Sequence, residues 1–288
     1  MSDRSSIEWT QATWNPTTGC DRTSPGCDHC YALTLAKRLK AMGNPKYQND
    51  GTSRTSGPGF GLTLHPEQVD LPRRWARARV VFVNSMSDLF HRDVPLGFIQ
   101  DVFAVMADTP RHTYQVLTKR SKRLAQIADK LEWSPNIWMG VSVETDSYAF
   151  RVDHLRAVGA AIRFISAEPL LGPVPSLDLS SINWVIAGGE SGKSARPMHP
   201  AWARQLRDAC QEAAVPFFFK QWGTWAPGPS EATFSVTVQG DLVQSDTLVG
   251  VPGAPAPVRR SSKAAAGRLL DGRTWDEMPT RAGSGLWA

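Results

Sequence analysis

The chain has 288 residues, of which 41% are hydrophobic and 20% charged, the composition of a folded globular protein with enough length for a large core. It has only four cysteines, too few for a secreted scaffold held by disulfides. The net charge of +5 at pH 7 favours an anionic partner, nucleic acid above all.

The N-terminal residues 1–6 lack the apolar segment of a signal peptide. No later stretch approaches the ~20 apolar residues that a membrane-spanning helix needs. We therefore expect a cytoplasmic protein that makes no membrane contact.

The first predicted elements are a strand over residues 7–14 and a helix whose apolar face runs from Leu33 to Met42 and ends at Gly43. Between them lies the loop G-C-D-R-T-S-P-G-C-D-H-C-Y-A, which holds three of the four cysteines. Clustered thiols in a reducing compartment indicate metal binding or redox chemistry.

Short apolar runs then alternate with amphipathic segments along most of the chain. Near-continuous apolar strands separated by helices indicate a parallel sheet covered by helices. The count of strands falls short of the ~8 of a closed barrel, so we predict an α/β fold with a partial (β/α)6 TIM-like barrel. An open doubly wound sheet is the alternative, although no G-x-G-x-x-G motif supports it. The later strands are predicted over 80–83, 114–117, 137–143, 161–165, 184–187 and 217–219, with helices over 98–106, 124–131, 148–155 and 202–210.

The last part of the chain changes character and is rich in proline, glycine and short apolar runs. A hairpin is predicted with strands over 234–238 and 242–243. We therefore divide the chain into a barrel over 1–223 and a C-terminal loop- and hairpin-rich appendage over 224–288. Trp275 and Trp287 indicate that the appendage packs on the barrel.

Polar groups follow each predicted strand at the point where it enters its loop. In a parallel barrel these strand ends meet on one rim, where such folds build their active sites. The cysteine loop follows the first strand and belongs to the same rim. The other segments are 84–88, 118–120, 142–145, 166–169, 188–191 and 220–222.

Three kinds of site could use Cys20, Cys27 and Cys30. A thioredoxin-like pair would leave Cys20 unexplained. A structural zinc site needs four ligands, and the fourth would be His29, Asp28 or a distant histidine. Three thiolates on a [4Fe–4S] cluster leave one iron open to a small molecule, which accounts for the odd number of cysteines.

The triad followed by an aromatic residue, C-x-x-C-Y, resembles the radical S-adenosylmethionine superfamily, whose core is a partial (β/α)6 barrel. The spacing here is C-x6-C-x2-C, longer than the common C-x3-C-x2-C. Across nearly the whole chain, the segments I-E-W-T-Q-A-T-W-N-P-T-T-G-C, G-G-E-S-G and G-R-L-L-D-G-R-T-W-D-E-M-P are similar to a phage- and bacterium-associated three-cysteine-motif family of unassigned activity.

The resemblance implies that the three cysteines hold a [4Fe–4S] cluster, which cleaves S-adenosylmethionine to a 5′-deoxyadenosyl radical. It implies that Tyr31 lies against the adenine, and that the polar strand ends hold the rest of the cofactor. It also implies a cellular electron donor such as flavodoxin or ferredoxin. The implied cofactor-binding positions besides Tyr31 are Met86, Ser87, Asp88, Lys119, Ser142, Glu144, Glu168, Gly189 and Glu190.

Two further residues are candidates for donating a hydrogen atom in catalysis, Cys210 and Tyr114. Cys210 stands on an apolar helix stripe and Tyr114 inside a strand, so both positions also suit plain core packing. The glutamates at strand ends could likewise cap helices or pair with Arg151 and Arg163.

Basic residues gather over 73–79, 119–123 and 259–263, as expected for a protein that binds phosphates. Together with the distant likeness to spore photoproduct lyase, they predict a nucleotide or nucleic-acid substrate, with Trp222 and Trp225 placed to stack on a base. The alternatives are a zinc-stabilised, non-catalytic nucleic-acid-binding protein and a radical enzyme that acts on a small metabolite.

Overall fold

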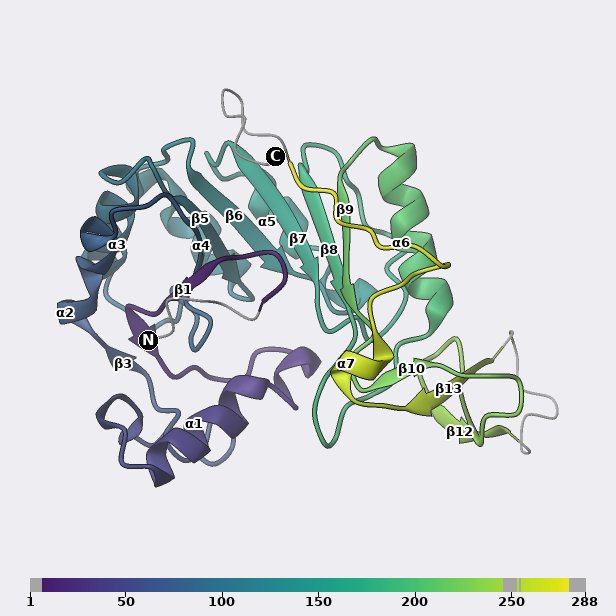
Figure 1. The fold of residues 1–288 in the computed structure, drawn as a ribbon. Coiled ribbons are helices and arrows are strands. Elements are labelled where there is room, and N and C mark those ends of the chain that lie inside the picture. The colour runs from purple at the N-terminus through teal and green to yellow at the C-terminus, as the bar shows by residue number, and fades with distance from the viewer. Residues whose placement is uncertain (1–6, 246–252, 254, 280–288) are drawn as a thin grey trace. The chain divides into compact units, whose positions relative to one another are not determined.

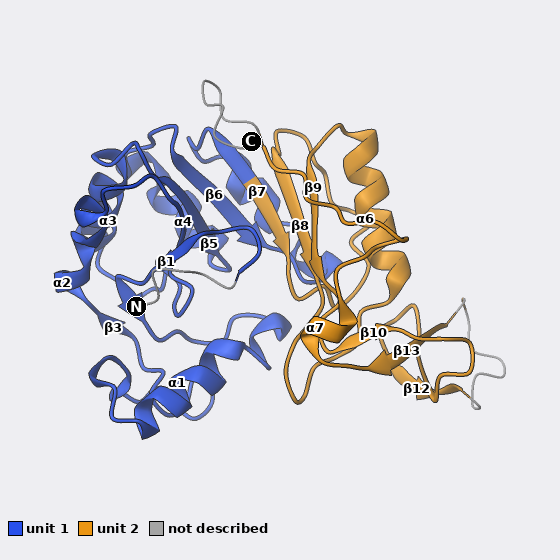
Figure 2. Ribbon diagram, viewed as in Figure 1, with its two compact units in different colours: residues 1–163 blue, residues 164–288 orange. Residues whose placement is uncertain are grey.

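The computed structural model describes residues 7–245, 253 and 255–279. Residues 1–6 and Trp287, on which two sequence-based expectations rest, lie outside the described residues. The chain forms two compact units, Met1–Arg163 and Phe164–Ala288, coloured separately in Figure 2. The division into a barrel over 1–223 and an appendage over 224–288 stays a prediction.

The strands of unit 1 run parallel and follow chain order: β1 (Ala12–Trp14), β4 (Val80–Val83), β5 (Thr113–Thr118) and β6 (Ile137–Ser142). All four residues of β4 and all six of β6 are buried, as expected for strands covered on both faces. The strand predicted over 7–14 is shorter, because Ile7 accepts a backbone hydrogen bond from Thr10 and the chain turns before it reaches the sheet.

The helices of unit 1 occupy the connections between these strands (Figure 1). Unit 1 also has a short antiparallel pair that the sequence did not predict, β2 (Thr17–Thr18) with β3 (Thr63–Leu64). The α-helices are α1 (Tyr31–Ala41), α2 (Pro66–Val69), α3 (Leu96–Ala107), α4 (Ser121–Ile127) and α5 (Arg151–Arg156). The 3-10 helices are η1 (Pro25–Cys27), η2 (Pro45–Tyr47), η3 (Leu71–Arg74), η4 (Ala128–Lys130) and η5 (Asp146–Tyr148).

Unit 2 continues the same alternation and then changes to antiparallel pairing. The strands β7 (Ile162–Ala167, whose first two residues belong to unit 1), β8 (Trp184–Gly188) and β9 (Phe217–Gln221) are parallel, and α6 (Pro200–Glu212) connects the last two. The predicted hairpin is present as β11 (Phe234–Val236) and β12 (Leu242–Gln244). It belongs to a sheet of order β10-β13-β11-β12, with β10 (Trp225–Pro227) and β13 (Ala256–Arg260), and α7 (Lys263–Ala266) follows.

The end of the described chain returns to strand β9. The amide of Phe219 donates to the carbonyl of Trp275, and the amide of Glu277 donates to the carbonyl of Phe217. Phe218 and Asp276 form an antiparallel bridge. Trp275 is buried, and its ring lies 5.9 Å from that of Phe217.

Parallel strands in chain order, separated by helices and followed by a hairpin-rich segment, confirm the predicted class, an α/β partial barrel with an appendage. In the part of the chain that the structure describes, no helix has both the length and the apolar character to cross a membrane.

Candidate functional site

The three cysteines lie in the loop that links β2 to α1, beside the carboxyl ends of β4, β5 and β6. Cys20 follows Gly19, which pairs with Ser87 in an isolated parallel bridge, so the loop after β4 continues alongside the cysteine loop. Cys27 ends the 3-10 helix η1, and Cys30 caps the N-terminus of α1. The loop is thus bound to the rim that the sequence predicted.

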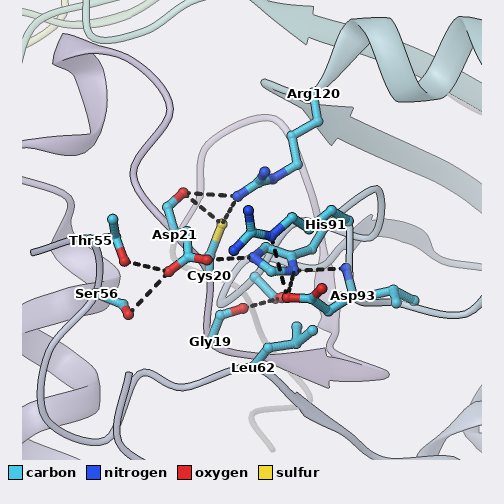
Figure 3. A network of polar contacts seen from close by, with 12 residues as sticks. Gly19, Cys20, Asp21, Thr55, Ser56, Leu62, His91, Asp93 and Arg120 are labelled. Carbon is cyan, nitrogen blue, oxygen red and sulfur yellow. Dashed lines mark hydrogen bonds and ion pairs between the residues drawn. The ribbon is translucent and has the colours of Figure 1, made fainter. Parts of the chain in front are cut away.

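Two cations from the end of β5 face the thiols. Arg120 donates from Nη2 to the Cys20 sulfur at 3.9 Å, as Figure 3 shows. Lys119 is mostly buried and exerts its charge on Cys27 and Cys30. Positive charge on all three sulfurs favours the thiolate form, which binds metals.

The pKa values of the thiols diverge. Burial raises the pKa of Cys20 to about 12, aided by the nearby Asp88 carboxylate and opposed by Arg120. Burial also raises the pKa of Cys30. At Cys27, burial acts in the same direction, but Lys119 and hydrogen bonds from the backbone of the preceding turn outweigh it and lower the pKa. Cys27 is therefore the readiest thiolate of the three, and loading metal on the others must displace protons.

Glu144 anchors one side of the long spacer between the first two cysteines. Its fully buried carboxylate accepts a hydrogen bond from Ser24 at 2.6 Å and lies 2.9 Å from Arg151 and 3.4 Å from Lys119. Burial raises the pKa of Glu144, but the two cations and Ser24 outweigh burial, so the pKa lies below its usual value. Gly26 packs directly on this side chain: a Cβ there would come within 2.6 Å of a carboxylate oxygen.

Asp21 anchors the other side of the spacer (Figure 3). Its carboxylate accepts hydrogen bonds from Thr55 at 2.6 Å and Ser56 at 3.3 Å, and it pairs with the buried His91 at 3.0 Å. His91 Nδ1 accepts the Asp93 amide at 3.3 Å, so Nε2 carries the proton donated to Asp21. The spacer that lengthens the motif is therefore fixed at both sides.

Three thiolates are the donor set that a [4Fe–4S] cluster takes when one of its irons stays open to a small molecule. Among residues 7–245, 253 and 255–279, no three or more His, Cys, Asp or Glu side chains are arranged to hold one metal ion. A [4Fe–4S] cluster binds each thiolate to a different iron, so its ligands need not converge on one point. In addition, Arg120 Nε is buried with no hydrogen-bond partner among the described residues. An unused buried donor beside Cys20 suits an anionic group at this place.

Two of the predicted cofactor residues of unit 1, Tyr31 and Met86, lie close to the cysteines. Tyr31 is 54% exposed, and its hydroxyl donates to the Ser85 carbonyl at 2.5 Å. Met86 is buried among apolar residues beside Cys20 and Cys30. Their contact with a cofactor stays a prediction.

Ser87, Asp88 and Ser142 are already bonded within the protein. Ser87 donates to the Gly19 carbonyl at 2.5 Å. Asp88 accepts from the Thr118 hydroxyl at 2.7 Å and from two backbone amides, so it joins the loop after β4 to the end of β5. The Ser142 carbonyl accepts from Arg151 at 2.7 Å. These residues shape the rim, and their contact with a cofactor stays a prediction as well.

In unit 2 the predicted residues lie at the ends of β7 and β8. Glu168 pairs with Lys220 at 2.8 Å, and the buried Glu190 pairs with Arg196 at 2.6 Å. A Cβ on Gly189 would come within 2.0 Å of the Trp222 carbonyl, so glycine is required there for packing. Their predicted role at a cofactor is untested, and the structure gives each a role within its own unit.

The two candidate hydrogen-atom donors are both buried. Tyr114 lies near the amino end of β5, the opposite end from Lys119, and its hydroxyl contacts Thr109 Oγ1 at 2.6 Å. Burial raises its pKa to about 12. Cys210 lies on the buried face of α6 in unit 2, and burial raises its pKa to about 12 as well. The structure does not bring Tyr114 to the cysteines, and the role of either residue stays a prediction.

A family model described as "Protein of unknown function (DUF5131)" matches residues 4–279. The chain belongs to this family. The match extends over both units, so the region that defines the family includes the cysteine loop and the C-terminal hairpin. No curated protein matches the sequence.

Among solved structures, the fold is similar to a mutant of spore photoproduct lyase, with a TM-score of 0.44 and 13% sequence identity. The likeness covers 74% of this chain and 64% of that one, so this chain spans less than two thirds of its length.

Sequence reasoning missed the roles of two residues that the structure places around the cysteines, Arg120 and His91. The sequence places Arg120 both in the strand-end segment 118–120 and in the basic cluster 119–123, but predicts no contact with the thiols. In that cluster only Lys122 is exposed, because Lys119 and Arg120 face the thiols and Arg123 donates to backbone carbonyls of His91 and Val94. The strand-end segment 118–120 already placed Arg120 on the predicted rim, but nothing in the sequence pairs it with Cys20.

Proposed function

We propose that the chain is a radical S-adenosylmethionine enzyme whose [4Fe–4S] cluster is held by Cys20, Cys27 and Cys30. The observation that carries the proposal is the placement of the three thiols in one strand-end loop, with Lys119 and Arg120 supplying positive charge. When bound, such a cluster passes one electron to the sulfonium of S-adenosylmethionine, which splits into methionine and a 5′-deoxyadenosyl radical that abstracts a hydrogen atom.

The residues of this chain would then bind and orient the cofactor. Tyr31 follows the last cysteine and is an exposed aromatic residue, which suits stacking on adenine. Lys119 remains a cation beside the cluster loop: burial lowers its pKa, but Glu144 and the thiols outweigh burial and raise it. It could pair with a cofactor carboxylate on its exposed part.

The experiment is anaerobic reconstitution followed by iron and sulfide analysis, and by measurement of 5′-deoxyadenosine released under reduction. Each of the variants Cys20→Ser, Cys27→Ser and Cys30→Ser should lower both the iron content and the release of 5′-deoxyadenosine. Cys210→Ser serves as the matched control and should keep its iron. One zinc without iron or sulfide would instead support the zinc-stabilised binding protein, and a loaded cluster that never cleaves the cofactor would contradict the radical chemistry.

For the substrate, we propose a nucleotide or nucleic acid, supported by exposed basic side chains. Arg74 and Arg77 are exposed beside Trp75 in unit 1, and Arg259 and Lys263 are exposed in unit 2. Binding through phosphates should weaken steeply as salt rises. A labelled oligonucleotide that fails to bind at low salt would remove this part of the proposal and leave a small metabolite as the substrate.

A further inference from the structure

The guanidinium of Arg120 lies at the sulfur of one proposed cluster ligand. Its Nη2 donates to the Cys20 sulfur at 3.9 Å and to the Asp21 carbonyl at 3.1 Å. Figure 3 shows both contacts of Arg120 with Cys20 and Asp21. The Nε–H of the same side chain is buried without a partner among the described residues.

The backbone of Arg120 is held in place by the end of its own strand. Its amide donates to the Thr118 hydroxyl at 2.9 Å, and that hydroxyl donates in turn to the buried Asp88 carboxylate at 2.7 Å. Asp88 also accepts the Lys119 amide at 3.1 Å. The backbone from which the Arg120 side chain extends is therefore fixed at the end of β5.

Lys119, the neighbouring cation, is placed for a different task. Its ammonium lies 3.4 Å from the Glu144 carboxylate, which offsets much of its charge. The Arg120 guanidinium makes no ion pair among the described residues, and its hydrogen bonds go to a sulfur and a carbonyl. Its charge is thus the less compensated of the two.

We propose that Arg120 is a positioning residue that raises the reduction potential of the cluster through its hydrogen bond to the Cys20 sulfur. The inference rests on the proposed function. Reduction adds one electron, supplied by a one-electron donor of the flavodoxin or ferredoxin class, so the reduced cluster carries one more negative charge. A cation bonded to a ligand sulfur stabilises that form, since hydrogen bonds to the sulfurs and net charge set cluster potentials.

The test is a potentiometric titration, followed by electron paramagnetic resonance, of the full-length protein reconstituted without oxygen. Arg120→Gln should shift the ratio of oxidised to reduced cluster at least about tenfold toward the oxidised form, which is about 59 mV to lower potential for a one-electron couple. Arg120→Lys keeps the charge and should recover part of the shift. Lys122→Gln is the matched control, because it removes the same charge from an exposed side chain two residues away.

Each outcome separates the two proposals. A wild-type protein that takes up no iron and sulfide contradicts the proposed function itself. A cluster that forms in Arg120→Gln with the potential of the Lys122→Gln control overturns the role of Arg120 and leaves the function standing. If Arg120→Gln cannot hold the cluster, the potential of Arg120→Lys is compared with that of Lys122→Gln. A lower potential supports the role of Arg120, and an equal potential overturns it. Loss of the cluster from both Arg120 variants in a folded protein would assign Arg120 to cluster assembly and overturn the proposal.

Discussion

Gly26 offers a direct test of how the cysteine loop is seated. Replacing it with alanine would place a Cβ 2.6 Å from one oxygen of Glu144 and 2.7 Å from its Cγ, closer than side chains approach one another. Glu144 cannot move aside freely, because Ser24, Arg151 and Lys119 hold its carboxylate. The loop must therefore lift from the end of β6.

Overpacking of this kind typically costs about 1–3 kcal/mol in the free energy of unfolding. Urea unfolding of the protein without its cluster should show that loss for Gly26→Ala. Because Gly26 directly precedes Cys27, the reconstituted variant should also hold less iron than the wild type.

Gly97→Ala is the matched control, since a Cβ there meets nothing within 4 Å in helix α3. Alanine in a helix should leave the stability unchanged or raise it by up to about 1 kcal/mol. If Gly26→Ala unfolds like the wild type and loads the same iron, the packing of the spacer on Glu144 is refuted.

Three further substitutions test other contacts. Glu144→Gln leaves Lys119 and Arg151 without a buried anion and should cost about 3–5 kcal/mol in the free energy of unfolding, measured in urea at pH 7. Because the folded state lowers the pKa of Glu144, the difference from wild type should shrink as pH falls below about 4.3. A difference that stays constant with pH would contradict the ion pairs. Gly189→Ala should destabilise unit 2 even without cofactor, whereas an effect on cofactor binding alone would argue for a cofactor contact. Tyr31→Ala should weaken S-adenosylmethionine binding by about tenfold in equilibrium dialysis of reconstituted protein, as expected for about 1–3 kcal/mol of stacking, with Tyr31→Phe close to wild type.

The alternation of strands and helices was predictable because it depends on local patterns. The apolar run Val80–Val83 is strand β4 with the same bounds, and the strand at 184–187 is one residue shorter than β8. The parallel arrangement predicted that the polar residues after these strands lie on one rim of the sheet. The start of the first strand was wrong, because a turn at Ile7 leaves only Ala12–Trp14 to pair with β4.

The site was predictable only where a motif or strand end marked it. Asp21 and His91 are 70 positions apart, and nothing in either local sequence pairs them. The residue types of Arg120 and the exposed Lys122 do not tell the two apart, because the direction of each side chain depends on where strand β5 ends. Gly189 was predicted as a cofactor-binding position, and the sequence does not show that the backbone of Trp222 packs against it.

The return of the chain to β9 protects the sheet against misassembly. A last strand normally presents unpaired amides and carbonyls, on which another chain can add a strand. Here the amides of Phe217 and Phe219 already donate to Glu277 Oε2 and to the Trp275 carbonyl. A chain cut before residue 275 would expose this edge, so it should self-associate through strand addition even if both units still fold.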